Sequence, residues 1–106
     1  MNISHNKYDT IEGIIFNEGL RISSVQLNTQ ENKLEINLNS NLTIVSPIKN
    51  YSNLKTATIK QLKNYRLVSN GIGIHWPELD EDLSLKGLLK EFLTKKINSK
   101  RKLIIA

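Results

Sequence analysis

One short segment of this chain gathers residue types that can do chemistry. Residues 71–84 have the sequence GIGIHWPELDEDLS, in which the imidazole of His75 is followed by four carboxylates. These carboxylates are Glu78, Asp80, Glu81 and Asp82. A histidine beside a carboxylate can act in acid–base catalysis, and clustered carboxylate oxygens can hold a hard divalent cation. The segment therefore raises two hypotheses: catalysis by His75 with Asp80 or Asp82, and a metal site at Glu78, Asp80 and Asp82.

The spacing supports neither hypothesis. The run DED lacks the glycine and the distant bidentate glutamate of a complete calcium loop. His75 follows Ile74 on an expected strand, where a histidine is more often packed and hydrogen-bonded than catalytic. The chain has neither a G-x-S-x-G nucleophile motif nor a glycine-rich phosphate loop. We therefore expect no enzyme, no bound metal and no cofactor.

The same segment has a structural interpretation that needs no chemistry. Trp76 would anchor the end of a strand, with its indole N–H bonded to one partner. Pro77 ends the strand, and Leu79 and Leu83 would hold the following residues against the core. The carboxylates then stand just before a helix, where the helix dipole favours negative charge. On this interpretation residues 78–82 form an acidic loop.

Basic residues form a second candidate site, because residues 36–77 carry five cations and no acidic side chain. Tyr51 and Tyr65 interleave with them, and aromatic rings could stack on bases while cations contact phosphates. Helical spacing brings Lys60 and Lys63 together, although a solvated helix face would have the same composition. No helix-turn-helix pattern or aromatic RNA-binding motif is found. The candidate nucleic-acid contacts are Lys55, Lys60, Lys63, Arg66, Lys100, Arg101 and Lys102.

Length and composition indicate one globular domain. The 106 residues are 39% hydrophobic, too apolar for a disordered chain, and their net charge of +5 is uneven because acidic residues 78–85 separate two basic segments. The absence of Cys excludes disulfides and thiol chemistry and favours the cytoplasm. The N-terminus lacks signal-peptide features, and no apolar window approaches the roughly 18 residues of a membrane span. We expect a cytoplasmic protein without membrane contact.

The elements that position these residues begin with an antiparallel meander. Residues 1–10 are polar and expected to be loose. In the sequence KLEINLN, Leu34, Ile36 and Leu38 alternate with charged and amide side chains, which is typical of a half-buried strand. The expected strands are residues 11–16 (or the start of one), 21–28, 33–39 and 42–47.

After residue 50 the hydrophobic period changes to that of a helix. One or two short helices are expected, with Ser52 or Asn53 capping the first and Thr58 the second. Asn70-Gly71 is a strong hairpin signal between two further strands. Ser84 is expected to cap the last helix. The remaining predicted elements are strands at 65–69 and 72–76, a helix from 85 to about 97 and a basic tail at 98–106.

These elements predict a single α+β domain over residues 1–106. A small antiparallel sheet, made of the N-terminal meander and the later hairpin, packs against short central helices and a C-terminal amphipathic helix.

The chain resembles a known family, the small bacterial domain of unknown function 2442. The resemblance covers residues 32–93 and is sharpest over GIGIHWPELDEDLSLKGLL, which is similar to that family's G-x-G-I-H-W-P-x-L-D-E-D-I-S element and following helix. The family's usual turn glycine is replaced here by Asn39-Ser40-Asn41. The resemblance implies an α+β domain without assigned catalytic residues. It also implies a gene often placed beside that of a second small protein, as in toxin–antitoxin pairs.

The leading functional expectation is a non-enzymatic protein-interaction domain, the antitoxin-like member of a two-protein module. Its acidic element, anchored by Trp76, would dock on a basic, nucleic-acid-facing surface of a small toxin-like protein. The alternative is a DNA- or RNA-binding regulatory module that uses the basic helix face and tail. The sequence leaves open whether the chain forms a homo-oligomer.

Overall fold

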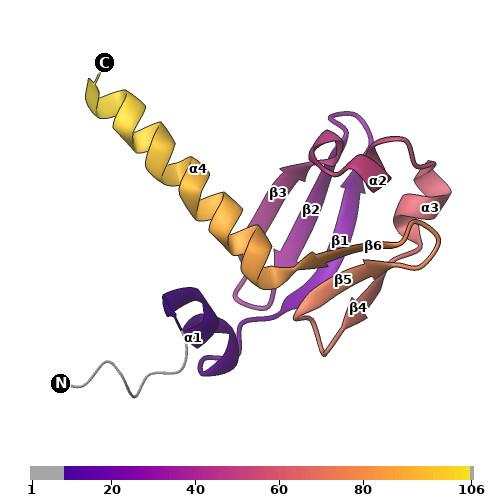
Figure 1. The fold of residues 1–106 in the computed structure, drawn as a ribbon, viewed down its shortest axis with the longest axis horizontal. Coiled ribbons are helices and arrows are strands. Elements are labelled where there is room, and N and C mark those ends of the chain that lie inside the picture. Colours follow the sequence, from indigo (N-terminus) through magenta and orange to yellow (C-terminus); the bar gives the residue numbers. More distant parts are fainter. Residues whose placement is uncertain (1–8, 106) are drawn as a thin grey trace.

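The computed structural model describes residues 9–105, with side chains described for residues 9–95. The chain forms two three-stranded antiparallel sheets with helices around them, which confirms the predicted α+β class (Figure 1). The first sheet has the order β1 (Ile22–Asn28), β2 (Lys33–Leu38) and β3 (Thr43–Pro47). The second has the order β4 (Arg66–Val68), β5 (Gly73–Trp76) and β6 (Glu81–Ser84). The helices are α1 (Thr10–Phe16), the 3-10 helix η2 (Ile48–Asn50), α2 (Ser52–Lys55), α3 (Ile59–Lys63) and α4 (Leu85–Ile105).

The first sheet follows from the alternation of its side chains. Leu34, Ile36 and Leu38 of β2 are buried, and the residues between them are half exposed. β1 carries a β-bulge between Ile22 and Ser24, which accounts for the imperfect alternation of that strand. The meander and its inward faces were therefore predictable from sequence, and the prediction is confirmed.

One hydrophobic core joins both sheets and the helices. Two backbone hydrogen bonds connect segments that are distant in sequence: the Ile22 N–H donates to the Gly71 carbonyl and the Leu85 N–H to the Ile72 carbonyl, both at 2.8 Å. Gly71 lies with Asn70 in the predicted turn between β4 and β5, with φ values of 100° and 63°. The buried apolar residues are Ile15, Ile22, Leu34, Ile36, Leu38, Ile44, Ile48, Leu54, Leu62, Ile74, Trp76, Leu85 and Leu88.

The two short helices confirm one predicted cap and correct the other. Thr58 caps α3 in a capping box with Gln61. α2 begins directly after η2, so its N-cap is Tyr51, which makes no side-chain capping bond. The prediction of Ser52 or Asn53 as the cap is wrong because the 3-10 turn places both residues inside α2.

Residues 11–16 are helical and do not form the predicted strand. The Asp9 side chain accepts a hydrogen bond from the Glu12 N–H at 2.8 Å, and Glu12 accepts from the Asp9 N–H at 3.1 Å. This capping box starts α1 and shortens the predicted loose N-terminus, of which residues 1–8 lie outside the described part. The pKa of Glu12 is lowered mainly by the 2.9 Å hydrogen bond from Lys86, and also by the hydrogen bond from the Asp9 N–H.

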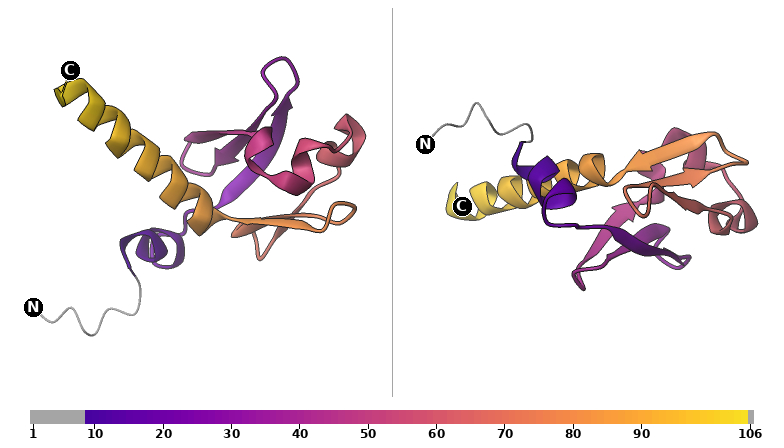
Figure 2. Two further views of the ribbon diagram at one scale, coloured as in Figure 1. Left: turned by 45° about the horizontal axis from the view of Figure 1, so that its top comes forward. Right: turned by 90° about the horizontal axis from the view of Figure 1, so that it is seen from below.

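α4 begins as predicted and continues further than predicted. The Gly87 N–H donates to the Ser84 hydroxyl at 3.0 Å, so Ser84 is the cap. The helix runs to Ile105, through most of the predicted tail at 98–106, and its distal half extends away from both sheets (Figures 1 and 2). Within the described chain no helix combines the length and hydropathy needed to cross a bilayer.

Candidate functional site

Residues 73–84 form one β-hairpin, which we call the acidic hairpin. It consists of β5, a turn at residues 77–80 and β6, and it carries Glu78, Asp80, Glu81 and Asp82. The sequence predicts a loop for residues 78–82, and this is wrong, because residues 81–84 pair antiparallel with β5. The carboxylates thus belong to a hairpin, and the side-chain hydrogen bond at the start of α4 comes from Ser84.

Trp76 holds the acidic hairpin in place. Its side chain is fully buried, and its indole N–H donates to the Leu62 carbonyl at 2.9 Å, as the anchor interpretation predicts. Leu79 and Leu83 pack against the same core from the turn and from β6. Trp76 therefore cannot itself touch a partner, and its role in any docking surface is to fix the position of the carboxylates.

The turn presents two of the four carboxylates to solvent. Glu78 is exposed and accepts a 2.6 Å hydrogen bond from the Asn64 side chain, which follows α3. Asp80 is exposed with a φ of 50°, a left-handed conformation that Asp tolerates better than most residues. The turn is thus positioned by a buried strand end on one side and by α3 on the other.

The two carboxylates of β6 face opposite sides of the second sheet. Glu81 lies opposite Trp76 on the inner side and is half-buried. Asp82 lies opposite His75 on the outer side, and its Oδ1 is 2.7 Å from His75 Nδ1. Arg66 lies opposite His75 on the other flanking strand, so one cross-strand row contains Arg66, His75 and Asp82. Sequence reasoning singled out these residues but could not place them in one row without β6.

The His75–Asp82 pair has the composition of a catalytic dyad but lies on an open sheet face. The side chains of His75 and Asp82 are 27% and 70% exposed, so water competes for the contact. Among the described residues, no three His, Cys, Asp or Glu side chains converge where they could hold a metal ion. The sheet therefore holds His75 and Asp82 in a fixed orientation on an exposed face.

A small depression adjoins Asp82, the outer carboxylate of β6. It measures about 250 Å³ and is bordered by Asp82, Ser84, Tyr51 and Glu91, where β6 meets α4. Burial raises the pKa of Tyr51, and the Glu91 carboxylate raises it further, while the Ser46 hydrogen bond opposes both. The phenol is therefore neutral at physiological pH. The charged groups that border the depression are the carboxylates of Asp82 and Glu91, and Lys95 Nζ lies 3.8 Å from Glu91.

The two tyrosines of the basic segment have structural roles that the sequence did not indicate. The Tyr65 hydroxyl accepts a hydrogen bond from the Val25 N–H at 3.0 Å, and the Tyr51 hydroxyl lies 2.5 Å from the buried Ser46 hydroxyl. Both rings are half-buried. Through these hydrogen bonds, Tyr51 connects the start of α2 to the first sheet, and Tyr65 connects the segment after α3 to it.

The predicted nucleic-acid contacts fall into two separate groups. Lys55, Lys60, Lys63 and Arg66 are exposed and lie on or beside α2, α3 and β4. The side chains of Lys100, Arg101 and Lys102 lie outside the described residues. Their backbone belongs to the distal end of α4, which is at the opposite end of the molecule from α3 (Figure 1). The tail therefore does not extend the basic surface of α3.

Comparisons with known proteins identify a family and two similar structures. The family model described as "Protein of unknown function (DUF2442)" matches residues 22–94. A protein of unknown function from Rhodospirillum rubrum is 27% identical, with a TM-score of 0.62 over 69% of this chain and 88% of that one. An uncharacterised protein from Chromobacterium violaceum is 26% identical, with a TM-score of 0.64 over 85% of each chain. No curated protein matches this chain.

Proposed function

The chain belongs to the DUF2442 family of proteins of unknown function, and from this premise we propose that it is a non-enzymatic protein-interaction domain. The proposed docking surface is the acidic hairpin. The observation that carries the proposal is the combination of a fully buried anchor, Trp76, with three exposed carboxylates, Glu78, Asp80 and Asp82, in and beside one short turn.

A rigid, charged projection is suited to selecting a partner by electrostatics. Complementary charges at the rim of an interface raise the association rate and exclude wrong partners more than they add affinity. Side chains that are already held, as Glu78 is by Asn64 and Asp82 by His75, lose less conformational entropy when they bind. The partner should therefore present a basic surface.

The depression beside Asp82 suggests how such a surface would engage. Its volume of about 250 Å³ suits one long side chain, and carboxylates from Asp82 and Glu91 border it. A lysine or arginine of the partner could enter it and meet both carboxylates and the Tyr51 hydroxyl. Glu91 was not among the sequence candidates, because its position on a helix face gave no sign that it lies near β6.

The family resemblance suggests what class of protein the partner is. We take this chain as the antitoxin-like member of a two-protein module, acting in the cytoplasm on a small toxin-like protein. The acidic hairpin would cover a basic, nucleic-acid-facing surface of that protein and so compete with nucleic acid for it. An enzymatic role for His75 and Asp82 is disfavoured because active sites are concave and exclude water, whereas this pair lies on an open face.

Nucleic-acid binding is the second candidate function. It is supported by the exposed cations Lys55, Lys60, Lys63 and Arg66 on consecutive elements. The Asn64–Glu78 hydrogen bond holds a carboxylate beside the end of α3, where it would repel phosphate. Because Glu78 lies beside these cations, we favour a protein partner over nucleic acid.

A capture experiment separates the two candidates. The full chain would be tagged and recovered from cells that naturally make it, with and without nuclease treatment. We expect one small basic protein to be retained in equal amount after nuclease treatment, because the proposed contacts are made between proteins. Recovery of nucleic acid alone, with every protein lost after nuclease treatment, would contradict the proposal and support the basic surface of α2, α3 and β4.

A further inference from the structure

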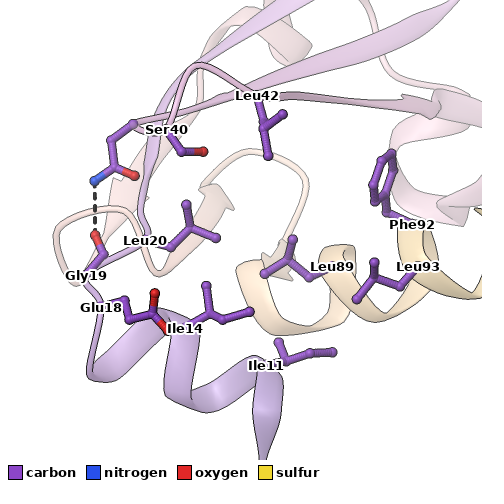
Figure 3. Close-up of a pocket in the computed structure, with 11 residues that line it drawn as sticks. Ile11, Ile14, Glu18, Gly19, Leu20, Ser40, Leu42, Leu89, Phe92 and Leu93 are labelled. Carbon is purple, nitrogen blue, oxygen red and sulfur yellow. Dashed lines mark hydrogen bonds between the residues drawn. The ribbon is translucent and has the colours of Figure 1, made fainter.

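An apolar groove, distinct from the acidic hairpin, lies between α1 and the first turns of α4. Its cavity volume is about 520 Å³, and the side chains that form its walls come from α1, the segment after it, the β2–β3 turn and α4 (Figure 3). The main apolar contributors are Ile11, Ile14, Leu20, Leu42, Leu89 and Leu93. Leu42 is 63% and Leu93 43% exposed, which is unusual for large apolar side chains gathered in one place.

The turn that forms one wall is fixed in position. The Asn39 side chain donates to the Gly19 carbonyl at 3.0 Å and accepts from the Arg21 N–H at 2.9 Å. Asn41 in the same turn has a φ of 69°. Asn39 therefore ties the β2–β3 turn to the segment after α1, and Leu42 stands at the rim of the groove. α1 lies outside the segment that matches the family model.

The first turns of α4 pack against the core beside the groove, and the rest of the helix extends away from the protein. Leu85 and Leu88 are buried, Leu89 and Phe92 are half-buried, and Leu93 is exposed. The helix backbone continues to Ile105 and away from the sheets (Figure 2), and the sequence becomes apolar again at residues 103–105. At 1.5 Å per residue, residue 103 lies roughly 15 Å beyond Leu93 on the same helix. The distal segment therefore cannot fold back into its own groove.

Charge indicates what kind of segment fits the groove. Residues 8–20 carry Asp9, Glu12 and Glu18 and no basic residue, and Lys86 bridges the first two. Residues 95–105 carry five basic residues and no acidic one. Of these three carboxylates, Glu18 lines the groove itself. An apolar and basic helical segment is complementary to an apolar groove that has a carboxylate in its wall. The distal half of α4 has this combination.

We propose that two copies of the chain pair through α4 in an antiparallel arrangement, with residues 95–105 of each copy in the apolar groove of the other. The antiparallel direction follows from charge, because a parallel pair would place two basic ends side by side. The arrangement is isologous, so both grooves are filled by one contact. It leaves the acidic hairpin free, and it does not depend on the proposed function.

The test is the mass of the full chain in solution, measured by light scattering at high micromolar concentration. We expect twice the chain mass of 12.1 kDa. Leu42→Asp should raise the dissociation constant by at least about tenfold, since it brings a charge into the apolar contact. Ile59→Asp is the matched control, because Ile59 is also exposed, at 53%, but begins α3 and lies outside the groove.

A second variant identifies the occupant of the groove. Leu103→Asp with Ile104→Asp should weaken the dimer as much as Leu42→Asp does, because both sides of the contact are needed. A wild-type monomer would overturn the proposal and leave the groove for another protein. A dimer that Leu42→Asp weakens but the distal variant does not would also overturn it, since another surface would then fill the groove. Unchanged circular dichroism would show that the variants are folded.

Discussion

Replacing Trp76 by Ala is expected to lower the free energy of unfolding by about 3–5 kcal/mol, the usual loss when a fully buried aromatic side chain is truncated. Trp76 is fully buried, and without it the Leu62 carbonyl loses a donor at 2.9 Å. Native domains have about 5–15 kcal/mol of stability, so this variant would be close to unfolding. Urea denaturation followed by far-ultraviolet circular dichroism measures the effect, because the variant no longer has its single tryptophan.

The companion variant Trp76→Phe separates packing from hydrogen bonding. It keeps an aromatic ring but removes the N–H, so we expect a smaller loss of about 1–3 kcal/mol. A loss below about 1 kcal/mol for Trp76→Ala would be typical of a surface position and would contradict the assignment of Trp76 as the anchor of the acidic hairpin.

Among Gly→Ala substitutions in this chain, Gly71→Ala is expected to lower the free energy of unfolding the most. A Cβ at this position would lie 2.4 Å from the Ile22 carbonyl oxygen and 3.0 Å from its nitrogen, and both are backbone atoms that cannot rotate away. The φ of 100° adds strain for any residue with a Cβ. The two sheets would have to separate at the bond that joins Ile22 to Gly71.

Gly19→Ala provides the matched control, because Gly19 also has a positive φ, 78°, but a methyl group on its Cα would have nothing within 4 Å. The control should lose about 1–2 kcal/mol from the backbone conformation alone. Gly71→Ala should lose about 1–3 kcal/mol more, the range typical of overpacking. Equal losses in urea denaturation would mean that the contact between the sheets can relax and that Gly71 is needed for its turn alone.

The parts of the fold that the sequence predicts correctly have strong local signals. β2 alternates apolar and polar residues without a break, Asn70-Gly71 fits a turn with positive φ, and Thr58 and Ser84 precede apolar helix stripes. Each of these signals depends on neighbouring residues alone. Local sequence signals were therefore sufficient to predict the meander of β1, β2 and β3, the β4–β5 hairpin, and the caps Thr58 and Ser84.

The errors occur where one signal hides another or where the contact is tertiary. In residues 81–84 the charges of an edge strand resemble those of a loop, and the turn before it uses Asp80 in place of Gly. In residues 11–16 the apolar run obscured the Asp9–Glu12 capping box, which could have predicted α1. The apolar groove had no sequence signal, because it joins α1, the β2–β3 turn and α4 across the whole chain.

The claim that the acidic hairpin is the docking surface is tested most directly by reversing its charges. The test variant carries Glu78→Lys and Asp82→Lys, two exposed positions without positive φ, so the fold should be retained. The control carries Glu31→Lys and Glu35→Lys, an equal change of charge at the turn and wet face of the first sheet. Exposed ion pairs contribute about 0–1 kcal/mol, so both variants should melt close to the wild type.

The measurement is the binding of each variant to the protein recovered in the capture experiment, by surface plasmon resonance at physiological salt. We expect the hairpin variant to bind at least about tenfold more weakly, chiefly through slower association, while the control binds like the wild type. If the hairpin variant binds as tightly as the control, the carboxylates of Glu78 and Asp82 do not contact the partner, and the acidic hairpin is an element of the fold alone.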